Sequence, residues 1–445
     1  MTETSTAPQQ QQPMAKVAIW TALSNLTLPL TSLATAPILA RELGATGRGE
    51  MASVVAPIFI LMLLANMGLP EAVAYHVVKL RQSPHRVLAH AARLSVVYGL
   101  VTAVGVWVAA PYFLHQSPQM VPLLRAVVVL LPLMMVLQVM RGVIIGLRAY
   151  KAGAFERVLT PVLRLGSFVV LLLLDRLTVT SAVWAQMVCT VVGGSYLGLA
   201  ILRHRHLPPE GGEPSYRRLT REIGVYGLRG WGGMLGNLVT WRLDQVVLVT
   251  VVAPREVGYY VVAVSFAEIS GIVVNPVRNV LFAEAAHRDS PELIARSTRV
   301  MTLLVALSAG VGCLLAEPVV RLLFGADFLP AVALGQVLLV ASIPFCLAQT
   351  IAAGLYAEGH PGMLSIAQVT GAVLTIGGLL VLAPHMGAMG AALASLVAYS
   401  VTCLMLVLQY RHVSGQPVRT FVLVERADLA WLGESVGRIV GKLER

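Results

Sequence analysis

The chain has 445 residues and a formal charge of +11; 57% of its residues are hydrophobic and only 12% are charged. Soluble domains carry about 25% charged residues, so this composition excludes an ordinary soluble protein and indicates helices that cross a membrane. The positive charge does not indicate a nucleic-acid partner, because most basic residues lie between apolar runs and on one side of them.

The first sixteen residues are polar and rich in glutamine, and they lack the basic start and short apolar core of a signal peptide. We predict a disordered cytoplasmic tail at 1–16. Twelve apolar runs long enough to cross a bilayer follow. These predicted spans lie at residues 17–40, 51–74, 89–111, 121–146, 157–175, 181–202, 223–252, 257–284, 299–318, 331–356, 362–383 and 387–410.

Lysine and arginine are distributed unevenly among the segments between these spans. If the N-terminus is cytoplasmic, twenty-two of them fall on the cytoplasmic side and five on the other side. This bias follows the positive-inside rule, and an even number of spans returns the C-terminus to the cytoplasm. The sequence therefore predicts a multi-pass membrane protein with both termini inside.

Short sequences recur at nearly one spacing along the chain. Gly49 in GRGEMASVVA and Gly258 in EVGYYVVAVS are 209 residues apart, and Gly146 and Gly354 are 208 apart. These matches indicate a duplicated six-helix unit. Because each unit holds an even number of spans, the two should be related by a pseudo-twofold axis along the membrane normal.

The predicted fold is all-α and integral to the membrane, with about twelve transmembrane helices in two six-helix bundles. Apolar residues recur at helical spacing near the C-terminus and predict an amphipathic helix, either on the inner leaflet or docked on a partner protein. The predicted segments are the tail 1–16, an N-terminal lobe 17–203, a cytoplasmic linker 204–222, a C-terminal lobe 223–412 and a cytoplasmic tail 413–445.

Charged residues inside the predicted spans are the candidate functional residues, because each costs roughly 2.5–3.5 kcal/mol to insert. Arg242 and Asp244 lie two residues apart, about 200° around a helix, so they cannot pair within it. Each needs a partner on another helix or a wet cavity. The same span contains the glycine-rich GWGG, and Pro276 should kink the next span beside Arg278.

We expect Arg141, Arg229 and Arg278 to face a central cavity and to receive an anionic head group. A guanidinium group donates two parallel hydrogen bonds to phosphate, which favours this interpretation. The alternative is that some of these arginines pair with Glu268, Glu284 or backbone carbonyls and only hold helices together. Including Arg242, the candidates for substrate binding are Arg141, Arg229, Arg278 and Arg242.

The loops lack the residue patterns of enzymes. None contains paired carboxylates in a structured context, a glycine-rich phosphate loop or a His/Cys metal cluster. We therefore predict no enzymatic activity, no cofactor and no metal site. Movement of a molecule through the membrane, driven by an ion gradient or a concentration difference, is the function class that this pattern favours.

Several motifs occur in a characteristic order. They are ILARELGATGRGEMA, NMGLPEAVAY, WRLDQVVL, EVGYYVVA, VVRLLFGADFLPA and MGAMGAALAS. In this order they resemble the polysaccharide transporter branch of the multidrug/oligosaccharidyl-lipid/polysaccharide flippase superfamily. The resemblance covers about residues 15–412.

The resemblance implies two six-helix bundles in a V shape that open alternately to each side of a bacterial inner membrane. It implies a flippase that moves undecaprenyl-diphosphate-linked oligosaccharide repeat units for surface or exopolysaccharide assembly. The diphosphate and sugars would enter the cationic cavity while the lipid tail stays in the bilayer. Membrane lipids and a polysaccharide polymerase would be its other partners.

One departure bears on the alternatives. The drug-extruding relatives commonly have an acidic residue in span one, whereas no charged residue lies between Lys16 and Arg41 here. This counts against a cation-coupled multidrug or small-molecule exporter of related fold. A non-transporting scaffold of a polysaccharide-assembly complex is the other alternative. Asp244 and Glu268 are the candidates for coupling transport to a proton or a sodium ion.

Overall fold

The computed structural model of the chain describes residues 14–80, 82–203, 216–268, 291–357, 360–422 and Asp428. Almost all of these residues are helical, and the described part contains no strand. The helices are α1 (Met14–Ala65), α2 (Leu69–Val78), α3 (Pro84–Phe113), α4 (Val121–Val127), α5 (Leu131–Gly146), α6 (Tyr150–Leu173), α7 (Val179–Leu202), α8 (Tyr216–Val251), α10 (Pro291–Leu323), α11 (Pro330–Ala357), α12 (Pro361–Ser414) and α13 (Arg419–Val422). Residues 254–268 are also helical, and short 3-10 turns lie at Pro118–Met120, Val128–Leu130 and Ala326–Phe328.

Long apolar helices are the expected outcome of this sequence, because a helix satisfies its own backbone hydrogen bonds inside lipid. Seven helical segments of the described residues are long and apolar enough to cross a membrane. Two of them, in α1 and α12, are broken at Gly44 and Gly387, where φ is 65° and 59°. Glycine tolerates these angles, so each long helix is two spans joined at a sharp turn.

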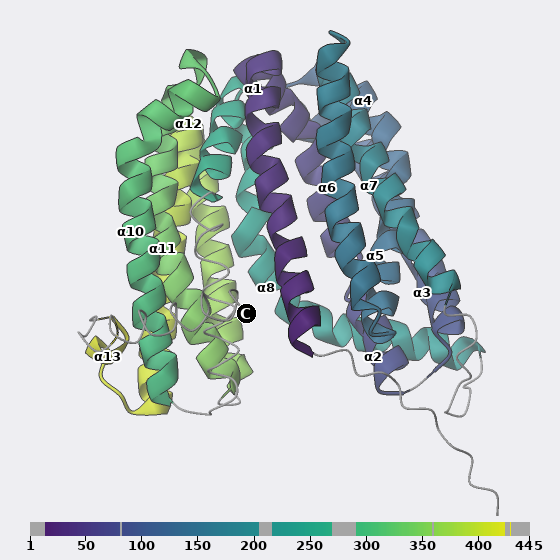
Figure 1. The fold of residues 1–445 in the computed structure, drawn as a ribbon. Helices are drawn as coiled ribbons and strands as arrows, with labels where there is room; N and C mark the ends of the chain where they lie inside the picture. The colour runs from purple at the N-terminus through teal and green to yellow at the C-terminus, as the bar shows by residue number, and fades with distance from the viewer. Residues whose placement is uncertain are drawn as a thin grey trace, which may run out of the picture.

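Together with α6, α8 and the helical residues 254–268, the described chain supplies a helix at each of the twelve predicted positions. The predicted fold class is confirmed. Figure 1 shows the helices gathered into two bundles, with α1 to α7 in one lobe and α10 to α12 in the other. Helix α8 connects them, because its start packs on α2 and α3 while its later part packs on α12.

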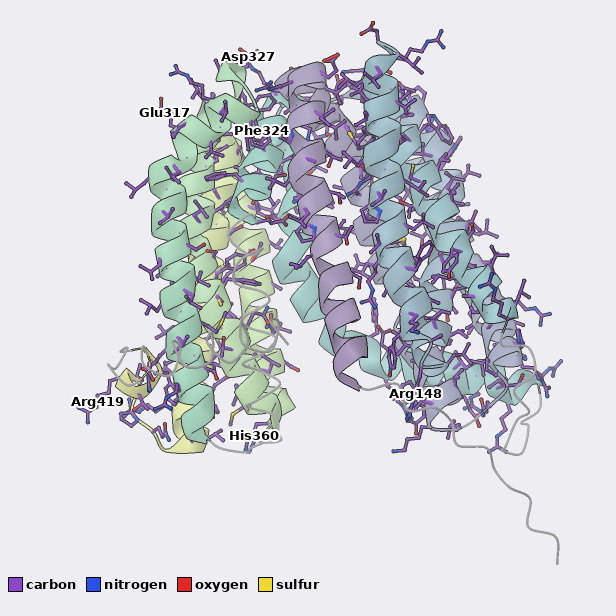
Figure 2. The ribbon with its side chains drawn as sticks, in the orientation of Figure 1. Arg148, Glu317, Phe324, Asp327, His360 and Arg419 are labelled. Carbon is purple, nitrogen blue, oxygen red and sulfur yellow. The ribbon has the colours of Figure 1, made fainter. Side chains whose placement is uncertain are left out.

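The two ends of the molecule carry different sets of loops. Figure 2 shows Arg148, His360 and Arg419 at one end and Phe324 and Asp327 at the other. We name these the Arg148 end and the Phe324 end. The twelve predicted spans place the loops of Arg148, His360 and Arg419 on one side of the membrane and the loop of Phe324 and Asp327 on the other. The observed positions of these loops agree with that prediction.

The lobes are joined at the Phe324 end. One continuous apolar core there combines N-terminal residues such as Leu39 and Leu124 with Tyr260, Phe324 and Phe328. Toward the Arg148 end the cores are separate, one in the N-terminal lobe and others in the C-terminal lobe. The ribbons of the two lobes likewise diverge toward this end in Figure 1.

A polar contact reinforces the joined end. The Nε of Arg41 in α1 donates a hydrogen bond of 2.9 Å to the carbonyl oxygen of Leu323, and the same guanidinium also donates to Leu322. Both acceptors are carbonyls at the C-terminal end of α10, which have no partner within their own helix. Arg41 therefore ties the N-terminal lobe to the C-terminal lobe at the Phe324 end.

The repeat predicted from Gly49 and Gly258 appears as a reciprocal contact between the lobes. A Cβ added at Gly49 would lie 1.6 Å from the carbonyl oxygen of Pro254, and one at Gly258 would lie 1.9 Å from that of Ala45. Ala45 and Pro254 are separated by 209 residues, as are Gly49 and Gly258. Residues that exchange partners in this way are the mark of a twofold relation.

A second pair of contacts obeys the same relation. In the N-terminal lobe, Gly47 packs against Val179. The residues 209 positions later are Glu256 and Ala388, and they also contact each other. The backbone N–H of Ala388 donates a hydrogen bond of 2.7 Å to the Glu256 carboxylate. Glu256 thereby holds the turn at Gly387. The internal duplication is thus visible in packing as well as in sequence.

Some predicted boundaries differ from the observed ones, and some lie outside the described residues. Helix α8 begins at Tyr216, so the last part of the predicted linker is the start of a helix. Residues 1–13, 204–215 and most of the predicted C-terminal helix fall outside the described part. From that last segment only Asp428 is described, and it is fully buried. The carboxylate of Asp428 accepts hydrogen bonds from Arg299 at 2.6 and 2.8 Å and from Arg296 at 3.2 Å.

Candidate functional site

Asp244 is a buried carboxylate on α8, near the joined end of the lobes. It is 6% exposed, and the hydroxyl of the fully buried Tyr260 donates a hydrogen bond of 2.5 Å to its Oδ2. The backbone N–H of Gln245 donates to Oδ1 at 2.8 Å. Such charge-assisted bonds are what a carboxylate within a membrane requires. The predicted need for a partner on another helix is therefore met by Tyr260, one helix further along the chain.

Arg141 lies near the Arg148 end of α5, where it is 38% exposed. Its Nη2 donates to Oε1 of Glu156 at 2.7 Å, and its Nη1 donates to Gln138 at 2.7 Å. Glu156, on α6, is only 2% exposed and also accepts from Thr160. Arg141 thus joins two helices of the N-terminal lobe while part of its side chain stays accessible.

Glu156 is a polar residue that the sequence analysis missed. It lies one residue before the predicted start of span five and is therefore not among the predicted intramembrane charges. The observed partner of Arg141 is this residue, rather than Glu268 or Glu284, to which the alternative interpretation pointed. Its position at the edge of an apolar run was the only signal available.

Arg229 lies on α8 just after this helix crosses the N-terminal lobe. Gly68 and Gly227 approach so closely there that a Cβ at Gly68 would lie 2.4 Å from the carbonyl oxygen of Gly227. One turn away, the rings of Tyr75 and Tyr226 stack at 4.3 Å. The Arg229 side chain is exposed, and the described part of the chain offers it no hydrogen-bond or ion-pair partner.

Arg48 and Arg164 are two further arginines of the N-terminal lobe that the sequence analysis does not propose as site residues. Arg48 is in α1 and Arg164 is in α6. The two helices that carry them, α1 and α6, pack against each other. The Nε atoms of both arginines are buried without a hydrogen-bond partner in the described structure.

The remaining sequence candidates are only partly described. Arg242 lies on α8, but its side chain is outside the described part, as is the whole of Arg278. Glu268 is exposed at the end of the helical residues 254–268 and does not lack an interaction partner. In the same described part, no group of three or more His, Cys, Asp or Glu side chains is arranged to hold a metal ion.

Two pseudosymmetric bundles that meet at one end, with ionisable residues among apolar helices, define a two-lobed membrane transporter fold. A lipid II flippase, MurJ, in an inward closed conformation has this fold with a TM-score of 0.74 and 12% identity, covering 92% of this chain and 89% of that one. A multidrug resistance MATE family transporter of the MOP superfamily matches with a TM-score of 0.72 and 14% identity in its inward-facing conformation, covering 88% and 98%. An outward-facing conformation described in the same words gives 0.63 and 14% identity, covering 90% and 95%.

The chain belongs to the polysaccharide biosynthesis protein family, which matches residues 14–282. A comparison with curated proteins gives no match. Family and fold agree with the resemblance drawn from the sequence, so the predicted polysaccharide family and the predicted transporter-like fold are confirmed.

Proposed function

We propose that this protein is a flippase that moves undecaprenyl-diphosphate-linked oligosaccharide repeat units across the bacterial inner membrane for surface or exopolysaccharide assembly. The Arg148 end would face the cytoplasm, with both termini on that side. The substrate's sugars and diphosphate would pass between the lobes while its polyprenyl chain remains in lipid.

The observation that carries this proposal is the surplus of cationic side chains among apolar helices. Arg229 is exposed and has no partner within the described chain, and Arg141 stays partly exposed although it pairs with Glu156. The Nε atoms of Arg48 and Arg164 are buried without a hydrogen-bond partner in the described structure. An anion with several acceptor oxygens would offset this charge, and a diphosphate presents such oxygens to guanidinium groups. A drug-extruding transporter for cations would need the opposite polarity.

Alternating access follows from where the lobes are joined. The core is continuous across both lobes at the Phe324 end and divided at the Arg148 end. With the proposed orientation, this is a state closed to the outside. The higher TM-score against the inward-facing transporter than against its outward-facing form supports the same interpretation.

The moving parts would be the proposed lobes at 17–203 and 223–412, joined by the linker at 204–222. Arg278 and Arg242 remain proposed substrate ligands beside Arg141 and Arg229. Asp244 and Glu268 remain the proposed sites for a coupling proton or sodium ion. A polysaccharide polymerase would receive the flipped product on the far side.

The test is a flipping assay in vesicles with a defined undecaprenyl-diphosphate glycan. Arg229→Ala should slow transport by about 10- to 100-fold, because hydrogen bonds to charged groups contribute about 1.5–3 kcal/mol each. Arg229→Lys keeps the charge but loses the planar guanidinium, so its transport rate should lie between those of the wild type and Arg229→Ala.

The matched control is Arg176→Ala, which removes an exposed arginine from the turn between α6 and α7. It should transport at the wild-type rate. If Arg229→Ala also flips the substrate at the wild-type rate, alone and combined with Arg278→Ala, the cationic-cavity proposal is wrong.

A further inference from the structure

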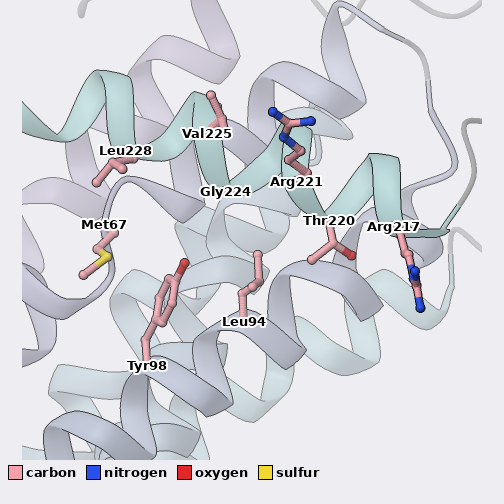
Figure 3. A pocket seen from close by; sticks show the side chains of 9 residues that line it. All are labelled: Met67, Leu94, Tyr98, Arg217, Thr220, Arg221, Gly224, Val225 and Leu228. Carbon is pink, nitrogen blue, oxygen red and sulfur yellow. The ribbon is translucent and has the colours of Figure 1, made fainter.

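The start of α8 forms a groove with α3 that the proposed transport path does not use. The cavity has a volume of about 460 Å³, within the range of about 300–1,000 Å³ that small-molecule sites occupy. Figure 3 shows Leu94 and Tyr98 extending from α3 toward α8. The groove is lined by Met67, Leu94, Tyr98, Arg217, Thr220, Arg221, Gly224, Val225 and Leu228.

The face of α8 that lines this groove is polar at one end and apolar at the other. Arg217 and Arg221 are one turn apart at the N-terminal end, and Gly224, Val225 and Leu228 follow on the same face at helical spacing. The opposite face buries Leu219 and Ile223 against the N-terminal lobe. The lining face therefore runs from two cations to apolar side chains over about 16 Å.

The two arginines of the groove are available to a ligand. Both are exposed, and the described residues give neither a hydrogen-bond nor an ion-pair partner. Their neighbour Arg218 differs, because it lies off the groove and its Nε donates to Glu222 at 2.8 Å. Thr220 fixes the helix against α3 through a hydrogen bond of 2.8 Å between its hydroxyl and the Nδ1 of His90.

The apolar end of the groove lies beside a surface suited to lipid. Helix α3 exposes Val97, Val101, Val104 and Val108, which recur at helical spacing along one side. Tyr98, which lines the groove, follows Val97 directly. A chain leaving the groove could therefore continue along α3 within the bilayer.

We propose that this groove holds an anionic glycerophospholipid as a resident ligand, with its phosphate on Arg217 and Arg221 and one acyl chain in the apolar part. Charge complementarity supports this occupant. The orientation in the proposed function, on which this step rests, places both arginines at the cytoplasmic boundary, where basic side chains attract the anionic lipids of that leaflet. All of the described lining residues belong to α3, the start of α8 or the turn after α1, so the groove is formed without α10, α11 or α12. The inference goes beyond the proposed function, since this lipid stays bound while the substrate moves.

The experiment is native mass spectrometry of the full-length protein, titrated with phosphatidylglycerol, with phosphatidylcholine of the same chains and with inorganic phosphate. The wild type should retain phosphatidylglycerol in preference to phosphatidylcholine. Arg217→Gln combined with Arg221→Gln should weaken retention of phosphatidylglycerol by about 10- to 30-fold, and Arg218→Gln should leave it within about twofold.

A second variant tests the apolar half of the site. A Cβ at Gly224 would meet only the Cδ1 of Leu94, at 3.9 Å, so the first carbon of a larger side chain is accommodated without a backbone clash. Gly224→Leu should fill the groove and reduce retention of both lipids while both arginines remain.

Several outcomes would overturn the proposal. The wild type would retain the two phospholipids equally, or Arg218→Gln would weaken retention of phosphatidylglycerol as much as the double variant does. Gly224→Leu would retain both lipids as the wild type does, or the protein would retain only inorganic phosphate. Displacement of phosphatidylglycerol by undecaprenyl phosphate at equal concentration would make the groove a substrate site instead.

Discussion

The hydroxyl of Tyr260 and the carboxylate of Asp244 form the shortest described link between α8 and the helix that follows it. At 2.5 Å in a buried site, this bond holds a charge that the membrane would otherwise disfavour. Arg141 and Glu156 serve a similar purpose between α5 and α6. At the scale of single residues, the protein compensates some of its intramembrane charges and leaves the Arg229 side chain without a partner in the described structure.

We expect the two members of the Asp244–Tyr260 pair to respond differently to substitution. Tyr260→Phe keeps the carboxylate but removes its donor, so it should lower the free energy of unfolding by about 1.5–3 kcal/mol, measured by thermal unfolding in detergent.

Asp244→Asn removes the charge and should reduce transport with normal protein abundance. If the Asp244→Asn variant keeps the wild-type transport rate and ion dependence, Asp244 is structural.

At the scale of helices, close approach of backbones decides where the lobes meet. Gly49 and Gly258 leave no room for a side chain, because each faces a carbonyl oxygen of the opposite lobe. Any larger residue must push the two helices apart. The same logic applies where Gly68 meets Gly227 under the start of α8.

Gly258→Ala should therefore destabilise the state in which the Phe324 end is joined. Its Cβ would lie 1.9 Å from the carbonyl oxygen of Ala45, so we expect longer distances between spin labels placed across that end, measured by pulsed electron paramagnetic resonance. Transport should fall as the balance between states shifts.

Gly310→Ala is the matched control for this change. Gly310 lies in α10 with no atom within 4 Å of an added Cβ, and alanine favours a helix interior over glycine by roughly 0.5–1 kcal/mol. This variant should keep wild-type distances and transport. Unchanged distances in Gly258→Ala would show that the glycine contact does not govern the joined state.

At the scale of the whole molecule, the two lobes share one core at the Phe324 end and have separate cores toward the Arg148 end. In this state the lobes are therefore parted at the Arg148 end, and opening of the Phe324 end would have to separate the core that they share there. Arg41, which reaches from α1 to the end of α10, would be among the contacts that break when the outer side opens.

The proposed orientation can be checked with single cysteines at opposite ends. Asp327 and His360 are exposed at the Phe324 and Arg148 ends, whereas the native Cys189, Cys346 and Cys403 are buried. A membrane-impermeant maleimide should label Asp327→Cys on intact spheroplasts and label His360→Cys only after lysis. The half-buried Cys313 would give background labelling, so it is replaced in both variants. The reverse labelling pattern would contradict a cytoplasmic Arg148 end.

The sequence by itself determined the number and order of the helices and the duplication. Hydropathy is a local property, so each apolar run is a helix whatever its neighbours do, because lipid leaves the backbone no other partner. The sequence match between Gly49 and Gly258 corresponds to a contact between the lobes, because both repeats have glycine where their helices cross.

Only the tertiary structure decided which charges meet and which end of the molecule is joined. Arg141 pairs with Glu156 and Asp244 with Tyr260, although nothing in their spacing along the chain selects these partners. Such pairings depend on how each helix is rotated and packed against its neighbours. That rotation is set by the summed contacts of many residues, which no local pattern contains.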